Sequence, residues 1–333
     1  MIRFTIVIPV YNIRPYLGEC LESVRRSLAS ADDVAVEVVC VDDGSTDGSG
    51  TLLDEWASAD CGPRFALKAI HQPNAGVGAA RNRALDAATG EWLLFLDGDD
   101  LVRESWLSDV ARVIRENEGV DLVGFGMLPH YGGEIKWGDD DFGIEPFSVG
   151  DEIPDALVGM SIYRLAYRRS RFGDIRFRSL SVGEDLVFTA EVFARATRCM
   201  VLSRREYLYR YREGSATHAD VSTAKLRDTV AFHVEMFRVL ESSGRRIGRA
   251  FVEGRGSMWI EELPKVLLPL RKTRDGRCVW EQWLDSMSFA AGLACLTESQ
   301  RRRARKVAAS RSAWSVLLNC RLPAWLRRKG FLR

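Results

Sequence analysis

The sequence contains no apolar run of the roughly 18 residues that a membrane-spanning helix requires, and we expect no such helix. The first apolar segment, residues 4–11, is too short for the apolar core of a secretory signal and leads directly into a turn. Low-complexity stretches and internal repeats are also absent. The apolar fraction of 46% and the charged fraction of 28% are typical of a soluble globular protein.

The seven cysteines form no CxxC pair and are scattered along the chain. Several lie in apolar patterns, as Cys40 does in a run of valines. This distribution is typical of reduced cysteines in a core and argues against a disulfide framework or a zinc site. We therefore expect a cytoplasmic protein.

The sequence also has little net charge, +1 overall, and gives no indication of nucleic-acid binding. The charge is unevenly distributed along the chain. Residues 301–333 contain eleven Lys or Arg and no acidic residue, so residues 1–300 have a net charge of −10. The same segment is rich in Trp and Leu. Such a segment can lie in the interface of an anionic membrane, as a peripheral anchor. It can equally form a helix that packs on the acidic body, so both alternatives stay open, as does the oligomeric state.

Strand-like apolar runs alternate with helical patterns over about the first 130 residues, which predicts a mainly parallel α/β sheet. We expect strands over 4–10, 36–41, 65–70, 92–96 and 122–128, and two short ones near 200 and over 207–211. Helices are expected from Pro15 and over 76–88, 104–118 and 186–196. Long helical patterns dominate after residue 219, so we expect two domains, 1–219 and 220–333.

Polar clusters follow three of the predicted strands: Tyr11-Asn12, Asp42-Asp43 and the run 97–100. Ligands of parallel sheets bind beyond the carboxyl ends of the strands, so we expect the clusters to converge on one crevice. Asp42 is suited to accept hydrogen bonds from a nucleobase or a ribose. The alternative is an Asx-turn that caps the next helix, a role we expect of Asp43 or Asp47.

Asp97, Gly98 and Asp99 directly follow the apolar run 92–96. Two carboxylates one residue apart can reach one divalent cation together, and Gly98 permits a close approach of the backbone. Such hard oxygen ligands suit Mg²⁺ or Mn²⁺, with substrate phosphates completing the shell. The alternative is a polar loop in which Asp100 or Ser105 caps the next helix.

The glycine-containing run 74–82 opens a predicted helix. Its glycines free backbone N–H groups, and a helix N-terminus favours anions. Arg81 would then pair with a phosphate. The run lacks the third glycine of the dinucleotide fingerprint, and an ordinary capped helix with a surface arginine is the alternative.

Glu184 and Asp185 follow Gly183 in the first turn of a predicted helix. Acidic residues there interact favourably with the helix dipole, which is a sufficient structural reason for the pair. The functional alternative is a general base kept ionised by the helix terminus. His218, in a predicted loop, is a candidate third metal ligand, and a solvated loop histidine is its alternative.

The ordered set of motifs resembles the family 2 glycosyltransferases of the GT-A fold, particularly bacterial members that build surface polysaccharides. The matching segments are 5–12, 15–24, 41–49, 74–85, 90–100 and 183–188, with a fainter match over 209–218. The resemblance covers about two thirds of the chain and implies a Rossmann-like mixed sheet flanked by helices, with a helical C-terminal extension.

The resemblance also implies an activity: inverting transfer of a sugar from a nucleotide-diphosphate donor to a hydroxyl of a glycan or lipid-linked glycan, assisted by Mn²⁺ or Mg²⁺. Asp185 would be the catalytic base, and Glu184 would support the acceptor. Asp99 and His218 would bind the metal. The implied nucleotide-sugar-binding residues are Pro9, Tyr11, Asp42, Asn74, Gly76, Arg81, Asp97 and Gly98.

Two other functions stay open. A nucleotidyltransferase on a similar sheet typically carries a glycine-rich basic loop after its first strand, where this sequence has the residues 9–12, Pro-Val-Tyr-Asn. A non-catalytic nucleotide-sugar-binding protein is expected to have degraded acidic motifs, whereas Asp42, Asp97, Asp99 and Asp185 are all present.

Overall fold

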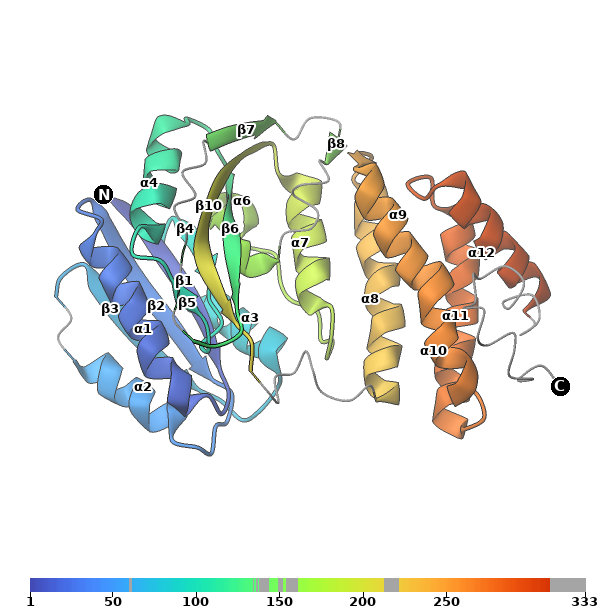
Figure 1. Ribbon diagram of the computed structural model, residues 1–333, viewed down its shortest axis with the longest axis horizontal. Helices are drawn as coiled ribbons and strands as arrows, with labels where there is room; N and C mark the ends of the chain where they lie inside the picture. The colour runs from blue at the N-terminus through green and yellow to red at the C-terminus, as the bar shows by residue number, and fades with distance from the viewer. Residues whose placement is uncertain are drawn as a thin grey trace. The chain divides into compact units, whose positions relative to one another are not determined.

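The computed structural model in Figure 1 describes residues 1–59, 62–133, 135, 137, 161–212 and 222–311, and the backbone of 144–148 and 152–153. The chain divides into two compact units. The sheet unit comprises residues 1–150, 160–179 and 195–219. The helical unit comprises residues 151–159, 180–194 and 220–333, so the segment 180–194 belongs with the C-terminal helices.

The sheet unit contains a mixed sheet whose longest pairings are parallel, which confirms the predicted α/β class. Within the described residues the sheet has nine strands, in the order β3-β2-β1-β4-β9-β6-β10-β5, with β7 paired to β10. Strand β9 is antiparallel to both β4 and β6. The strands are β1 (Ile2–Val10), β2 (Val34–Asp42), β3 (Phe65–His71), β4 (Trp92–Phe95), β5 (Leu101–Val102), β6 (Leu122–His130), β7 (Ile144–Ser148), β9 (Leu165–Arg168) and β10 (Arg198–Arg210).

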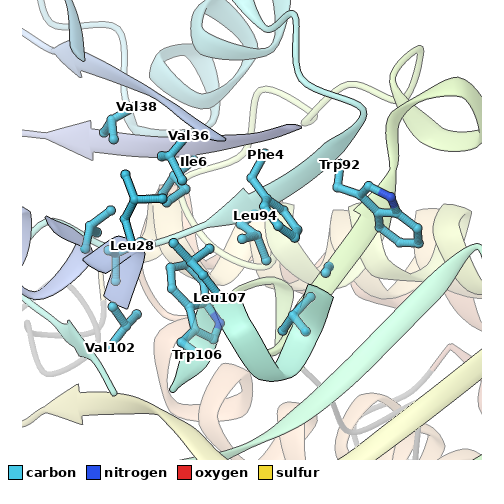
Figure 2. Close-up of a cluster of buried hydrophobic side chains, with 14 of the residues drawn as sticks. Phe4, Ile6, Leu28, Val36, Val38, Trp92, Leu94, Val102, Trp106 and Leu107 are labelled. Carbon is cyan, nitrogen blue, oxygen red and sulfur yellow. The ribbon is translucent and has the colours of Figure 1, made fainter. Parts of the chain in front are cut away.

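Helices connect the parallel strands and cover the apolar faces of the sheet (Figure 1). They are α1 (Arg14–Ala29), α2 (Ser49–Ser58), α3 (Val77–Ala87) and α4 (Trp106–Glu116), with the short η1 (Ile162–Arg164) and α6 (Arg169–Phe172) later in the chain. Except for Ile2, the β-branched side chains of β1 and β2 are buried, as expected for strands covered by helices. Figure 2 shows Phe4 and Leu94 of the strands gathered with Trp106 and Leu107 of α4 in this core.

One long strand replaces the two short ones expected near residues 200 and 207–211. Strand β10 runs unbroken from Arg198 to Arg210, and its register against β6 shifts on either side of Arg205. Such irregularities bend a strand without ending it. The apolar pattern is interrupted between the two predicted strands, but the strand itself continues through this segment.

The helical unit contains α7 (Glu184–Arg195), α8 (Thr223–Ser242), α9 (Arg249–Ser257), the π-helix η3 (Met258–Glu262), α10 (Leu263–Leu270), α11 (Arg274–Gly292) and α12 (Glu298–Ser310). Two short parallel strands, β8 (Glu152–Ile153) and β11 (Arg246–Ile247), pair beside them. Trp259 of η3 is fully buried in this unit. Its carbonyl oxygen accepts a 2.9 Å hydrogen bond from the Trp283 indole, and its ring stacks on Phe237 at 5.4 Å between centroids.

The described part of the basic segment packs within the helical unit. Arg303 forms an ion pair with Glu261, and Arg311 forms ion pairs with Glu281 at 3.0 Å and Asp285 at 2.7 Å. For residues 301–311 the structure therefore favours packing over membrane binding; residues 312–333 lie outside the described part. No described helix is both long enough and apolar enough to cross a membrane.

The described cysteines are not linked by disulfide bonds. Cys20, Cys40 and Cys199 are buried free thiols, as the sequence pattern predicts, and Cys278 is exposed. Burial raises the pKa of the Cys20 and Cys40 thiols well above the ordinary value, so both stay protonated. These residues therefore act as apolar core side chains.

Candidate functional site

Hydrogen bonds join the loops that follow β1 and β2. The Asn12 N–H donates to the Ser45 hydroxyl at 3.0 Å, and the Asn12 side-chain carbonyl accepts from the Thr46 N–H at 2.8 Å. Asp47 accepts from the backbone N–H of Arg14 at 2.9 Å, at the start of α1. Asp47 also accepts from the Ser49 N–H at 2.9 Å, at the start of α2, which is the capping contact expected of it. It therefore binds the first turns of both α1 and α2.

Asp42 lies at the end of β2, with only 6% of its surface exposed. One of its oxygens accepts from the Ser45 N–H at 2.9 Å, and the other lies 3.0 Å from His71 Nδ1. The hydrogen bonds to Asp42 and Asp54 raise the pKa of His71. Asp42 therefore makes the Asx-type turn expected of its neighbours, and its role toward a nucleoside stays a prediction.

Asp43 holds the segment that opens α3. Its carboxylate is 3% exposed and accepts from the backbone N–H of Ala75 and of Gly76, each at 2.8 Å, and from the Gln72 amide at 2.7 Å. The Gly76 N–H is therefore bound within the protein, contrary to the expectation that it is free for an anion. Gly76 itself has φ 90°, a conformation that favours glycine.

Asn74 and Gly76 are exposed at the N-terminus of α3, next to Asp43. Pro9 and Tyr11 lie at the end of β1, and Tyr11 is 50% exposed. These residues of the implied donor site thus occur at the carboxyl ends of β1, β2 and β3, as predicted for a site in a parallel sheet.

Arg81, in the second turn of α3, is buried rather than on the surface, at 5% exposure. Its guanidinium donates to the Asp97 carboxylate at 2.8 Å and lies over the Phe177 ring, 5.4 Å from the centroid. The alternative of an ordinary helix with a surface arginine is therefore wrong. The buried charge needs a partner, and Asp97 supplies it.

Asp99 is paired with a second guanidinium. The Arg212 Nε donates to Asp99 at 2.5 Å, and the Arg212 side chain lies over the Tyr16 ring. Burial and the nearby charge of Asp97 raise the pKa of Asp99. The side chains of Asp97 and Asp99 keep 28% and 18% of their surface exposed. Both carboxylates are thus accessible and each already binds a cationic group.

Asp100 does not cap a helix. Its carboxylate, 1% exposed, accepts from the Tyr207 hydroxyl at 2.5 Å and from the Arg210 N–H at 2.7 Å, so it holds β10. The Tyr207 hydroxyl also accepts from the Asp97 N–H at 3.2 Å. Ser105 occupies the N-cap position of α4 without a capping bond, because its hydroxyl donates to Glu206. The helix-cap alternative for this acidic run is therefore wrong.

Gly98 leaves room for the core beneath the acidic run. A Cβ atom there would lie 2.5 Å from Ile13 Cδ1 and 3.3 Å from Ile8 Cγ2. A side chain at this position would require Ile13 to move. Gly98 is thus required by packing, whatever its role toward a ligand.

The described residues contain no group of three His, Cys, Asp or Glu side chains placed to hold a metal. His218 lies outside the described residues. Asp97 and Asp99 nevertheless fit a divalent cation, because both supply hard oxygen ligands from one turn. The ion pair of Asp99 with Arg212 shows that a cationic group can lie against this carboxylate. Phosphate oxygens of a substrate would complete such a shell.

Glu184 and Asp185 are in the first turn of α7, in the helical unit. Glu184 is 8% exposed, and Asp185 accepts a 2.8 Å hydrogen bond from the Leu186 N–H. The pair therefore belongs to the helical unit, and the acidic run 97–100 belongs to the sheet unit. Its role as base and acceptor support stays a prediction.

Sequence reasoning missed Tyr207, Arg212 and the anchoring role of Asp43. The signal for Arg212 was present, since it directly follows a predicted strand and lies in the faintly matching segment 209–218. Tyr207 gave no such signal, because its hydroxyl reaches residues of the acidic run that lie more than a hundred positions away.

Comparison with known proteins was consistent with this geometry. The family model described as Glycosyl transferase family 2 matches residues 5–173. The chain is 28% identical over 228 residues to the uncharacterized glycosyltransferase EpsJ of Bacillus subtilis, a match that covers 64% of this chain and 62% of EpsJ. It is 30% identical over 211 residues to the poly(ribitol-phosphate) β-N-acetylglucosaminyltransferase TarS of Staphylococcus aureus, with 63% of this chain and 35% of TarS covered. The chain thus spans less than two thirds of either relative.

A crystal structure of residues 1–349 of S. aureus TarS in complex with UDP-GlcNAc has a TM-score of 0.70 against this chain, at 23% identity. The match covers 100% of this chain and 93% of that structure. A likeness of this extent confirms the fold expected from the motifs, a GT-A sheet unit with a helical C-terminal region.

We expect Tyr207→Phe to lower the free energy of unfolding by about 2 kcal/mol, because it removes the donor to the buried Asp100 and the acceptor of the Asp97 N–H. Urea unfolding measures this change. Tyr209→Phe is the matched control, since Tyr209 lies two residues along the same strand and stacks on Tyr163 through its ring. Equal losses in the two variants would contradict an anchoring role for the Tyr207 hydroxyl.

Proposed function

Because this chain belongs to glycosyl transferase family 2, we propose that it moves a sugar from a nucleotide-diphosphate donor to a hydroxyl of a glycan or lipid-linked glycan, with inversion at the anomeric carbon. The observation that carries the proposal is the family match over residues 5–173, which includes Asp99 and the ion pair of Arg81 with Asp97. The same match favours a glycosyltransferase over a nucleotidyltransferase or a non-catalytic binding protein.

The donor diphosphate is proposed to bind where the two carboxylate–guanidinium pairs lie. Arg81 pairs with Asp97, and Arg212 pairs with Asp99. The Arg212 side chain is 26% exposed, so an incoming anion can compete with Asp99 for its guanidinium, whereas the Arg81 side chain, 6% exposed, lies buried beside Asp97. A bound Mn²⁺ or Mg²⁺, held by Asp99 and Asp97, would supply Lewis-acid neutralisation of charge on the leaving diphosphate.

The nucleoside half of the donor is proposed to lie against the loops at the ends of β1, β2 and β3. Tyr11 offers an exposed ring, and Asp42 retains acceptor capacity on both oxygens beyond the bonds to Ser45 and His71. Asp43 binds the backbone N–H groups of Ala75 and Gly76, which directly follow Asn74. This arrangement supports a preformed pocket edge, which limits the ordering that donor binding requires.

The acceptor hydroxyl is proposed to lose its proton to Asp185 as its oxygen attacks the anomeric carbon. The bond from that carbon to the diphosphate breaks in the same step, so no covalent enzyme intermediate forms. Position in the first turn of α7 favours the ionised carboxylate, which is the form a base needs. Glu184 is proposed to support the acceptor.

The donor proposal is tested with a panel of UDP-, GDP- and dTDP-sugars in the presence of Mn²⁺. We expect turnover of at least one donor by the wild type and a loss of roughly 100-fold for Asp99→Ala, because charge stabilisation of the leaving group is removed. Asp86→Asn, an exposed carboxylate paired with Arg176, is the control and should match the wild type. Full activity of Asp99→Ala would contradict the proposed metal site. Absence of turnover with every donor would contradict the proposed glycosyltransferase activity.

For the base, Asp185→Asn should lower kcat by roughly 100-fold or more while the calorimetric affinity for the donor stays within about twofold. Asparagine keeps the size of the side chain but cannot take the proton. Parallel loss of donor affinity would instead assign Asp185 to donor binding or to structure.

We also propose that residues 312–333 bring the enzyme to the inner face of an anionic membrane, at the cytoplasmic side. The segment continues beyond the packed helix α12 and holds five of the eleven basic residues counted from Arg301. A chain ending at Arg311 should sediment less with anionic vesicles than the full chain. Identical sedimentation of the two chains would contradict membrane binding by this segment.

A further inference from the structure

One face of α8 holds the loop that leads into the acidic pair Glu184–Asp185. The Asp228 carboxylate accepts two hydrogen bonds from Ser181, one from the backbone N–H at 2.8 Å and one from the hydroxyl at 2.5 Å. Ser181 lies three residues before Glu184. The direction in which the chain enters α7 is therefore fixed by a carboxylate of another helix in the same unit.

A second contact lies one helical turn further along α8. Gly183 has φ 79°, and a Cβ atom on it would lie 2.2 Å from Phe232 Cδ1. The Phe232 ring thus lies directly against the backbone that starts α7. Because Asp228 and Phe232 are four residues apart, they belong to the same face of α8.

Phe232 is itself held by a rigid stack. Its ring stacks on His233 at 4.1 Å between centroids, and His233 in turn stacks on Trp259 at 6.1 Å. His233 Nδ1 lies 2.7 Å from the Thr229 carbonyl oxygen. Burial lowers the pKa of His233 to about 4, so the ring is neutral near pH 7. The contact against Gly183 is therefore backed by fully packed side chains.

The far end of α7 is tied to the same unit. Arg245, just beyond α8, donates from its guanidinium to the Phe193 carbonyl oxygen at 3.1 Å. The half-buried Arg255 of α9 carries a charge that interacts favourably with Asp185. Both ends of α7 and one of its acids thus depend on residues of the C-terminal helices.

We propose that Asp228 and Phe232 of α8 are positioning residues for the Glu184–Asp185 pair. The C-terminal helices then hold the proposed general base in place and are not a separate domain without a part in the reaction. The inference rests on the proposed function, in which Asp185 takes the proton of the acceptor. A base acts only within hydrogen-bond reach of its proton, and a displacement of about 1 Å can cost roughly 100-fold in rate.

The kinetic test compares variants of Asp228 in the full chain. Asp228→Ala should lower kcat by roughly 10- to 100-fold, with KM for the donor and its calorimetric affinity unchanged. Asp228→Asn should recover most of the loss, because its side-chain oxygen can still accept from Ser181. Arg227→Ala is the matched control, since Arg227 is the exposed neighbour on α8. A kcat for Asp228→Ala within twofold of the wild type overturns the proposal.

Ser181→Ala probes the same contact from the other side and keeps the backbone N–H bond to Asp228. It is an exposed position, so the variant should fold even if Asp228→Ala does not. We expect a few-fold loss of kcat without a change in KM for the donor. A loss confined to KM would overturn the positioning role.

Hydrogen exchange of residues 181–188 gives a readout that needs no turnover. Asp228→Ala should speed the exchange of this segment about tenfold, whereas Arg227→Ala should leave it unchanged. Unchanged exchange in Asp228→Ala overturns the inference whether or not a donor has been found. If exchange of residues 181–188 is faster in Asp228→Ala but Asp185→Asn is as active as the wild type, Asp185 is not the base. The finding that α8 holds this segment in place is then still supported.

Discussion

Buried carboxylates at the carboxyl ends of the strands are the constraint on which the rest of the site depends. A buried polar group without a hydrogen-bond partner costs about 1–3 kcal/mol, so each of these acids must bind donors from the surrounding chain. Asp43 binds the N–H groups that open α3, and Asp100 binds β10 through Tyr207 and the Arg210 N–H. Loops that are far apart in the sequence are thereby held at one edge of the sheet.

The acids of this edge divide into two kinds by exposure. Asp43 and Asp100 are nearly inaccessible and bind backbone and neutral side-chain donors, so exchanging their partners would leave buried groups unsatisfied. Asp97 and Asp99 remain partly exposed and bind guanidinium groups. Water reaches both side chains of the Asp99–Arg212 pair, so this pair can exchange partners at lower cost than the pair of Asp97 with the buried Arg81. The accessible pair is therefore suited to bind ligands, while the buried acids keep it in place.

The helical unit follows a similar logic around the second acidic pair. Gly183 is required at the start of α7 because its positive φ and the Phe232 ring leave no room for a side chain. Asp228 holds the preceding turn, and the Trp259 cluster backs the ring. Even the basic segment from 301 to 311 contributes here, through ion pairs with acidic side chains of the same unit. The C-terminal helices are thus structural support for a motif that precedes them in the chain.

Sequence alone determined the strand–helix alternation, the polar clusters at the strand ends and the family resemblance, because apolar periodicity and motif spacing are local properties. Only the tertiary structure decided which neighbouring acid became an anchor and which stayed accessible. Asp99 and Asp100 are adjacent, yet Asp100 is buried by Tyr207, which lies 107 positions away. Arg81 is likewise buried by Asp97 and Phe177, and the start of α7 is held by α8. Burial and pairing depend on residues that meet only in the folded chain, so spacing along the sequence does not contain them.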